Sequence, residues 1–503
     1  MDTTSKLILA VDIGTSSTRV AAFRADGTIS GLEQYRYETV ITGPQQEEQD
    51  PDMVFSRIGE AITACLSRPD ILVENVEGIV FSSQMYSTFP VSADDRPLMN
   101  NIIWSDARAE KVAAALRKDD DLALRLYRET GCPVNSIYPL SKIIWLREHC
   151  PDLHSKAACF VSIKDYVIKK ITGEWISDYS MASGTGMFDI VNHCWSPEAL
   201  ELAGLRETQL PRLVSSDAEF TFRNSRLREE WGLPEHIRVF PGGGDGPLAN
   251  IGSGAARPGE INIDLGTSGA ARVIVDQPSF DEDGRLWCYH AAPGYWAYGG
   301  IISNAGNSWA WLSSNIAAFR NAEAAENSMI TMGHFAEEIA PGSDGLFFLP
   351  YIRKARAPYW DDRLQGSLFG LCVHHDIRHF ARVLLEAIAY DLTEILEIAS
   401  QKAELADRII LTGGLVKSPI VPQLIADVSG KRVETPCHTE GSLAGAAIIG
   451  LKALGILKDY AFHNTGKSGN KIYLPDFENY SLYQDLRRDY ARRVKLVREL
   501  DNL

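Results

Sequence analysis

Residues 7–23 read LILAVDIGTSSTRVAAF, and residues 261–275 read INIDLGTSGAARVIV. Each stretch is an apolar strand, then Asp-(Ile or Leu)-Gly-Thr-Ser, then a second apolar strand, which predicts a tight β-hairpin. Asp12 of the first copy and Asp264 of the second lie about half the chain apart. This spacing favours one hairpin used twice, at the head of each of two similar domains, over a short-period repeat.

The turn in each copy is suited to bind phosphate. Gly14 and Gly266 permit a tight turn and close approach of the backbone. The hydroxyls that follow are small donors, and the N–H groups of the turn can face a phosphate. Asp12 offers an acceptor for hydrated Mg²⁺ at the end of its strand. A tight Asp-Gly turn without a ligand is the alternative for either copy alone, and two copies in register argue against it.

The composition is that of a folded protein that does not bind nucleic acid. Among 503 residues, Lys and Arg number 50 and Asp and Glu 66, and the net charge of −16 repels phosphate backbones. The N-terminal residues lack the features of a secretory signal, and no apolar stretch reaches the roughly 18 residues of a membrane span. The eight cysteines form no Cys-x-x-Cys pair, which favours reduced thiols and a cytoplasmic protein without structural zinc.

The rest of the chain predicts mixed α/β structure. Glycines and a proline between 252 and 259 place the domain boundary just before the second hairpin, which gives domains of residues 1–254 and 255–503. Apolar spacing predicts a long helix over 376–403 with Asp376 as its N-cap, and a charged helix over 481–500. An amphipathic helical stretch is expected over 106–129.

The glycine-rich segments exclude two common nucleotide-binding motifs. None reads GxxxxGK[ST], and the segment 242–246 (GGGDG) lacks the GxGxxG spacing of a dinucleotide-binding fold. That segment instead predicts a glycine strand end that projects the single carboxylate of Asp245. A carboxylate placed so is suited to take a proton from a substrate hydroxyl during in-line attack on a phosphoryl group. An aspartate in a plain glycine-rich turn is the alternative on this segment alone.

The order of these segments resembles the FGGY family of carbohydrate kinases. The similarity comprises the two hairpins, the segment ending in Asp245, the Thr-Gly-Gly of 412–414, and a C-terminal signature at 366–371 followed by His375-Asp376 and a helix. It spans residues from about 7 to about 460. The resemblance implies an α/β fold of two actin/hexokinase-like (ribonuclease H-like) domains with an active-site cleft between them. It also implies ATP-dependent phosphorylation of a sugar or polyol hydroxyl, with residues 1–254 on the sugar side and 255–503 on the nucleotide side.

The resemblance also assigns roles to individual residues. Asp245 would be the catalytic base, and Asp12 and Asp245 would hold Mg²⁺. The residues implied for ATP are Thr15, Ser16, Ser17, Gly266, Thr267 and Ser268 at the phosphates, and Gly413, Gly414 and Ser418 at the adenosine. Gln423 is a weaker candidate for a nucleotide contact.

The sugar pocket is expected in the first half of the chain. The resemblance implies a loop of Gln84, Met85 and Tyr86 and a second segment with Trp104, Asp106 and Arg108, besides Lys164 and Asp245 itself. A Trp packs on the apolar face of a sugar, and Asp and Arg bond its hydroxyls or a carboxylate. A core aromatic with a surface charge is the alternative for Trp104 and Arg108, and a solvated charge at a helix start is the alternative for Lys164.

Four segments, 162–166, 178–186, 244–250 and 299–306, look most like the gluconokinases of the family. A gluconate carboxylate would require a cation, which Lys164 or Arg108 could supply. Tyr86 stands where relatives usually have His, which leaves a pentulose such as xylulose, another aldonate or an unusual polyol open as the substrate.

Two other functional classes are alternatives to a sugar kinase. A nucleotide-dependent switch on the same actin-like fold would not need the sugar-pocket residues, and a two-domain dehydrogenase would need the missing dinucleotide motif. The expected partners are ATP, Mg²⁺ and a small sugar or sugar acid, with no nucleic acid and no membrane, and a homodimer is left open.

Overall fold

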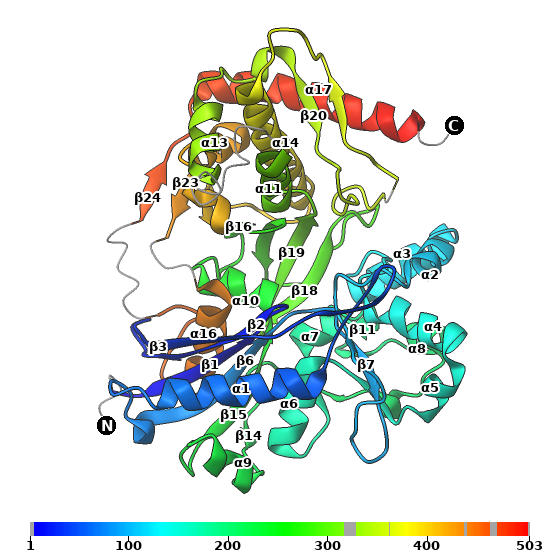
Figure 1. The fold of residues 1–503 in the computed structure, drawn as a ribbon, viewed down its shortest axis with the longest axis vertical. Coiled ribbons are helices and arrows are strands. Elements are labelled where there is room, and N and C mark those ends of the chain that lie inside the picture. The colour runs from blue at the N-terminus through cyan, green and yellow to red at the C-terminus, as the bar shows by residue number, and fades with distance from the viewer. Residues whose placement is uncertain (1–4, 316–327, 362, 437–439, 463–469, 501–503) are drawn as a thin grey trace. The chain divides into compact units, whose positions relative to one another are not determined.

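The computed structural model describes residues 5–315, 328–361, 363–436, 440–462 and 470–500 (Figure 1). The chain forms two compact units. Unit 1 comprises Met1–Ala256, Val275–Ala297 and Glu440–Gly466, and unit 2 comprises Arg257–Ile274, Tyr298–Thr439 and Lys467–Leu503. The boundary expected at 254/255 lies next to the first passage of the chain into unit 2, but two later segments return to unit 1.

Unit 1 is built on a six-stranded mixed sheet with the strand order β14-β15-β6-β1-β2-β3. β1 and β2 are antiparallel, with Asp12 opposite Arg19, and parallel pairing joins β1 to β6 and β6 to β15. The first hairpin is therefore confirmed. The strands run over Leu7–Ile13 (β1), Ser17–Phe23 (β2), Ile29–Arg36 (β3), Val76–Ser83 (β6), Phe220–Thr221 (β14) and Arg238–Gly244 (β15).

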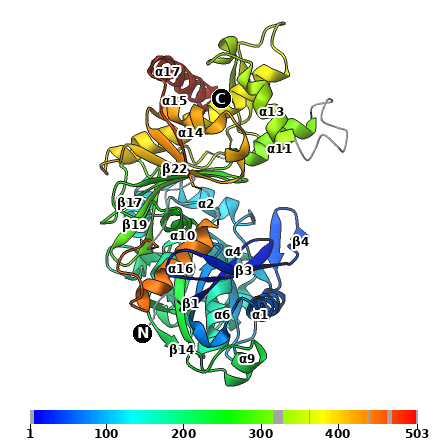
Figure 2. The same ribbon diagram turned by 90° about the vertical axis from the view of Figure 1, so that its left-hand side faces the viewer.

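Helices cover both faces of this sheet (Figure 2). Leu7, Leu9 and Val11 alternate along β1 and join one apolar core with residues of α1 (Pro51–Leu66) and α6 (Ile163–Thr172). This period of two places one face of the strand in that core. The intervening Ile8 faces α16 (Gly441–Ala453), where its Cδ1 lies close to Gly450.

The placement of α16 explains why the late segment 440–466 belongs to unit 1. α16 packs on β1, β6 and β15, and most extensively on α10 (Asp245–Gly252). A Cβ on Gly445 would lie 2.0 Å from the carbonyl oxygen of Leu248, so only glycine lets the two helix backbones approach this closely. The helix that carries Asp245 therefore rests on a helix from the far end of the sequence.

Smaller elements complete unit 1. The stretch 106–129 is not one helix but two, α2 (Glu110–Leu116) and α3 (Asp120–Thr130), because Asp119 accepts from the Leu122 N–H group and starts a new helix. The other helices are α4 (Pro139–His149), α5 (Pro151–Lys156), α7 (Tyr179–Ser183), α8 (Pro197–Ala203) and α9 (Ser225–Glu230). The other strands are β4 (Val40–Gly43), β5 (Gln46–Gln49), β7 (Phe89–Val91), β8 (Asn101–Ile102), β9 (Cys159–Val161), β10 (Ile176–Asp178), β11 (Phe188–Asp189), β12 (Cys194–Trp195), β13 (Arg212–Val214) and β18 (Trp287–Ala292).

Unit 2 carries the second hairpin in a mixed sheet, within which β19-β17-β16-β22-β23-β24 are neighbours in this order. β16 is antiparallel to β17 and parallel to β22, which places Thr412 beside Asp264. The second hairpin is therefore confirmed as well. The strands are β16 (Ile261–Leu265), β17 (Gly269–Val275), β19 (Tyr295–Ile302), β22 (Arg408–Thr412), β23 (Arg432–Thr435) and β24 (Lys471–Tyr473), and a separate pair is formed by β20 (Phe347–Leu349) and β21 (Ser367–Phe369).

The helices of unit 2 surround a long buried one, α14 (Ile377–Ser400), which contacts α13 (Ser328–Glu337), α15 (Val421–Ser429) and α17 (Phe477–Leu500). α11 (Gly306–Asn315) also packs on it. Asp376 is the N-cap of α14, as the sequence predicted, and α17 begins at Phe477, earlier than the expected residue 481.

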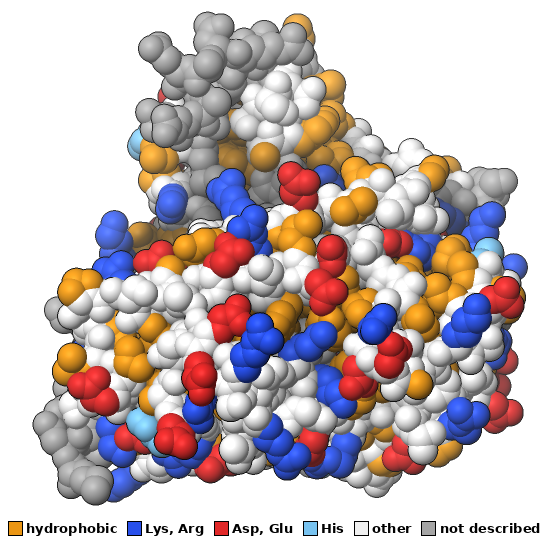
Figure 3. All heavy atoms as spheres, turned by 60° about the horizontal axis from the view of Figure 1, so that its bottom comes forward, with side chains coloured by type: hydrophobic (Ala, Val, Ile, Leu, Met, Phe, Trp, Pro, Cys, Tyr) orange, Lys and Arg blue, Asp and Glu red, His pale blue; other side chains and the backbone are white. Residues whose placement is uncertain are grey.

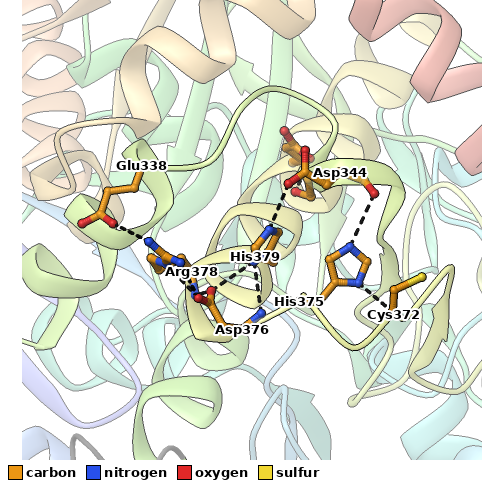
Figure 4. Close-up of polar contacts among 9 residues, drawn as sticks. Glu338, Asp344, Cys372, His375, Asp376, Arg378 and His379 are labelled. Carbon is orange, nitrogen blue, oxygen red and sulfur yellow. Dashed lines mark hydrogen bonds and ion pairs between the residues drawn. The ribbon is translucent and has the colours of Figure 1, made fainter.

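His375 and Asp376, which follow the signature of residues 366–371, lie at the start of α14 (Figure 4). Asp376 Oδ1 accepts from the Arg378 N–H group at 3.0 Å, and its other oxygen pairs with the Arg378 guanidinium. His379, almost buried, lies within 3.1 Å of carboxylate oxygens of both Asp376 and Asp344. These contacts make Asp376 the cap of α14 and hold His379 beside it.

The surface matches the composition. On the face shown in Figure 3, blue and red side chains of the described residues alternate without a continuous basic stripe. Among the described residues, no helix is both long and apolar enough to cross a membrane.

Candidate active site

Three strands of the unit 1 sheet end beside one another, and candidate residues follow each end. Ile13 of β1 and Gly244 of β15 both pair with Ser83 of β6. Asp245 comes directly after β15, as the first residue of α10. Because these strands are parallel, the hairpin turn, the loop after Ser83 and Asp245 share one edge of the sheet, the edge where ligands bind in such sheets.

Asp245 stands at a junction that requires glycine. A Cβ on Gly244 would lie 2.6 Å from the Met85 side chain. The Gly244 N–H group donates to Ser180 Oγ at 3.1 Å, and Asp245 Oδ1 accepts from the Gly246 N–H group at 2.8 Å. The Asp245 carboxylate is partly exposed, so it can receive a proton from a hydroxyl held within hydrogen-bond reach.

Asp12 is buried, and its two carboxylate oxygens differ. Oδ2 accepts from Arg19 Nη2 at 2.6 Å, and Arg19 Nη1 pairs with Glu440 at 2.6 Å. Burial opposes the charge of Arg19, but Asp12 and Glu440 outweigh it and raise the pKa of the guanidinium. Asp12 Oδ1 is buried without a hydrogen-bond partner among the described residues. An orphaned carboxylate oxygen at this edge fits a hydrated Mg²⁺, which prefers oxygen ligands and keeps several waters.

The first hairpin is tied to the expected sugar pocket through Thr15. Thr15 Oγ1 accepts from Trp104 Nε1 at 2.8 Å and donates to Gln84 Oε1 at 3.3 Å. The Ser17 hydroxyl accepts from Gln34 at 2.8 Å. Ser16 is exposed, so its hydroxyl is the most accessible of the three expected at the phosphates.

A buried lysine, Lys142, supports the loop of Gln84, Met85 and Tyr86. Gln84 and Met85 are buried, and Tyr86 has a left-handed backbone with φ of 68°. The fully buried Lys142 donates to the carbonyl oxygens of Tyr86 at 2.7 Å and of Ile103 at 2.8 Å. Lys142 therefore joins the two segments expected to line the sugar pocket.

The ring of Tyr86 belongs to a cluster of tyrosines. Its hydroxyl lies 3.4 Å from the Tyr289 hydroxyl, which in turn lies 2.8 Å from that of Tyr138. Burial raises the pKa of Tyr289 well above its ordinary value, so this hydroxyl stays neutral and can donate. The side chain of Tyr86 therefore packs against two other aromatic residues, Tyr138 and Tyr289.

Arg108 is not a surface charge. Its side chain is 4% exposed, and Nη2 contacts Glu48 at 2.6 Å and Asp106 at 2.7 Å. Burial alone would lower the pKa of Arg108, but these two carboxylates raise it. The guanidinium also lies over the ring of Trp145, 5.2 Å from its centroid. Asp106 and Arg108 therefore hold each other and the end of β5 in place.

Lys164 is not the solvated charge that a helix start suggests. It is 0% exposed, and its ammonium lies 2.5 Å from the carboxylate of Asp178, which is also 0% exposed. Burial lowers the pKa of Lys164, and Asp178 opposes that shift. A fully buried ammonium already paired with a carboxylate is poorly placed for direct contact with a substrate.

In unit 2, the glycines expected at the nucleotide lie at the ends of neighbouring strands. Gly266, Thr267 and Ser268 form the turn between β16 and β17, and Gly413 follows β22. Gly413 has φ of 99°, and a Cβ on Gly414 would meet no atom within 4 Å. The open space at Gly414 leaves room for the close approach of a bound nucleotide.

The remaining nucleotide candidates lie deeper. Ser418 is fully buried, and its hydroxyl has no hydrogen-bond partner among the described residues. Gln423 donates its amide to Asp427 at 2.7 Å and to the Leu474 carbonyl at 2.8 Å, so its side chain has structural partners.

Sequence reasoning missed three residues that organise this edge: Arg19, Lys142 and Ser180. Arg19 could have been found, because the hairpin register places it opposite Asp12. Lys142 and Ser180 act through contacts 39 to 64 positions away along the chain, which no local pattern reveals.

Residues 7–252 match the N-terminal domain of the FGGY family of carbohydrate kinases, and residues 261–454 match its C-terminal domain. The chain belongs to this family. A gluconokinase of Bacillus licheniformis is 32% identical to this FGGY kinase over 501 residues, which cover 98% of the chain and 96% of that protein. Two solved structures from Lactobacillus acidophilus, a ligand-bound xylulose kinase and a gluconate kinase, match with TM-scores of 0.91 and 0.90, each at 28% identity and with 98% of both chains covered.

The FGGY kinase is therefore a carbohydrate kinase with two actin/hexokinase-like α/β domains, and kinases of this family use ATP. The position of the two units about a cleft stays a prediction.

Proposed function

We propose that this FGGY kinase transfers the γ-phosphoryl group of ATP to a hydroxyl of gluconate, with Asp245 as the catalytic base. The observation that carries the proposal is the position of Asp245, which is partly exposed and directly follows the end of β15. Phosphoryl transfer demands a positioned hydroxyl, charge neutralisation and exclusion of water more than covalent chemistry. A carboxylate held at a strand–helix junction can position the substrate hydroxyl.

The other candidate residues divide the remaining tasks. The turn of Gly266, Thr267 and Ser268 would hold the phosphates, the open backbone at Gly414 would face the adenosine, and the loop of Gln84 to Tyr86 would orient the sugar. Asp12 and Asp245 would hold Mg²⁺, which would neutralise charge on the phosphates when bound. The buried, unpaired Oδ1 of Asp12 supports that assignment.

Gluconate is the first candidate because of the motif pattern and the gluconokinase of B. licheniformis. One observation favours xylulose as a second candidate. Both cations expected to meet a gluconate carboxylate, Arg108 and Lys164, are buried and paired with carboxylates. A sugar acid would then depend on neutral donors, whereas an uncharged ketose needs only those.

The test is a coupled assay for ADP release, with Mg-ATP and a panel of D-gluconate, other aldonates, D-xylulose, L-xylulose, L-ribulose and glycerol. Turnover on gluconate alone supports the first candidate, and turnover on a ketopentose replaces it by the second. Asp245→Asn should abolish turnover while ADP binding, measured by calorimetry, stays within about twofold. Asp120→Asn, an exposed aspartate of α3, is the matched control. Full activity of Asp245→Asn would remove the assignment of the base.

A further inference from the structure

The buried ion pair of Lys164 and Asp178 needs an explanation. Both side chains are 0% exposed, and their charged atoms lie 2.5 Å apart. Burying two charges is costly, and a pair of apolar residues would often be at least as stable. Lys164 lies in the first turn of α6, and Asp178 ends β10, so the pair joins two elements.

The pair leads directly to the start of α7. Asp178 is the N-cap of this helix, and its Oδ1 accepts from the Met181 N–H group at 3.0 Å. Its Oδ2 faces Lys164. One oxygen therefore meets the ammonium and the other meets the helix, which fixes the carboxylate in a single orientation.

α7 in turn holds the residue before Asp245. Ser180, fully buried in α7, accepts the Gly244 N–H group on its Oγ at 3.1 Å. A Cβ on Gly243 would lie 3.1 Å from the same oxygen. Glycines lose much conformational freedom when they are ordered, so a junction made of them depends on outside contacts for its position.

We propose that Lys164 and Asp178 are positioning residues: through the N-cap of α7 they place Ser180, which holds Gly244 and so sets the position of the Asp245 carboxylate. The proposal rests on the proposed function, because it takes Asp245 as the base. It gives Lys164 a task different from contact with the substrate. A misplacement of about 1 Å at a reacting group can cost on the order of 100-fold in rate.

The first test is kinetic. Ser180→Ala should lower kcat by about 10–100-fold and leave the KM values for sugar and ATP within about twofold, because substrate contacts are intact. Lys164→Met should do the same. The double variant should be no slower than the slower single variant, because residues in one chain of contacts are not additive. Thr172→Val is the control, since this buried hydroxyl contacts only the Ile168 carbonyl oxygen and the Glu174 N–H group among the described residues, both at the far end of α6 from Lys164.

The second test does not depend on the substrate. Hydrogen exchange of the peptide that contains Gly244 should speed up in Ser180→Ala and Lys164→Met, and stay unchanged in Thr172→Val, because the bond to Ser180 protects that amide. Unchanged exchange in Ser180→Ala would overturn the proposal. If Lys164→Met does not fold, Ser180→Ala still decides.

Two kinetic outcomes would also overturn it. A Lys164→Met variant with normal kcat and a raised sugar KM would make Lys164 a substrate contact, and purely additive effects would separate Lys164 from Ser180. Failure of the proposed function looks different. Full activity of Asp245→Asn would refute the base, whereas an inactive Asp245→Asn with normal Ser180→Ala kinetics and exchange would refute this inference alone.

Discussion

Lys142 should control sugar affinity without touching the sugar. Its ammonium supports the carbonyl oxygens of Tyr86 and Ile103 and is fully buried. Lys142→Met keeps most of the side-chain volume but removes the ammonium group that makes both hydrogen bonds. Tyr86 then loses the contact that holds its left-handed backbone, with φ of 68°.

The magnitude follows from that backbone. A bulky residue in the left-handed region costs on the order of 1–3 kcal/mol and persists only where its surroundings enforce it. Once the contact is lost, the loop can relax by that amount, which corresponds to a factor of roughly 5–150 in population. The apparent affinity for the sugar falls with the fraction of loops in the binding conformation. We therefore expect Lys142→Met to raise the sugar KM about 5–150-fold and to leave the ATP KM unchanged.

The assay is steady-state kinetics with the preferred substrate of the panel, at saturating ATP and again at saturating sugar. Lys170→Met, in which the lost ammonium only faces the ring of Tyr166, is the matched control. In a Tyr86→Gly background the effect of Lys142→Met should shrink, because glycine adopts positive φ without strain. A sugar KM within about twofold of wild type in folded Lys142→Met, or an equal rise in the ATP KM, would refute this reasoning.

Three further outcomes are expected. Gly413→Ala should abolish ADP binding in calorimetry, because φ is 99° and its Cβ would lie 2.4 Å from the Leu265 carbonyl carbon. Asp376→Ala should lower Tm without changing kcat, since losing an N-cap costs about 0.5–2 kcal/mol, whereas Asp376→Asn keeps the cap. Burial raises the pKa of Asp391 to about 7, so the folded state holds a proton that the unfolded state releases, and stability falls as pH rises towards 7. Between pH 5 and pH 8 the Tm of wild type should therefore drop more than that of Asp391→Asn.

Local patterns predicted the elements on which the site is built. The two hairpins could be predicted because two apolar strands and a glycine turn are encoded within about 17 residues. The helix cap at Asp376 could be predicted as well, because a cap and the helix that follows it are also encoded by neighbouring residues. The glycine run before Asp245 predicted a strand end, and β15 does end there, whereas the role of Asp245 as the base stays a prediction.

Long-range packing was not predictable from the same signals. α16 is a buried helix rich in small residues, but nothing in its local sequence indicates that it packs on the sheet of unit 1. Lysine is the residue least often buried, so the burial of Lys164 and Lys142 contradicts the usual expectation. Both depend on partners that are distant in sequence, Asp178 for one and two backbone carbonyls for the other.

The two hairpins share a sequence but not an environment, and this difference predicts unequal roles for their aspartates. Asp12 pairs with Arg19 through one oxygen and leaves the other buried and unpaired. Asp264 accepts instead from the Thr412 hydroxyl at 2.9 Å, a neutral donor that an amide oxygen can also satisfy.

Asp12→Asn should therefore weaken the binding of Mg²⁺ in the presence of ADP by about 10–100-fold, the range seen when a group that supports a metal is lost. Asp264→Asn should change it far less, because asparagine keeps the bond to Thr412. Titration with Mn²⁺, followed by its electron paramagnetic resonance signal, measures both variants without relying on turnover. Equal losses in the two would show that the metal depends on both hairpins alike, and the orphaned oxygen of Asp12 would then have no special part in binding it.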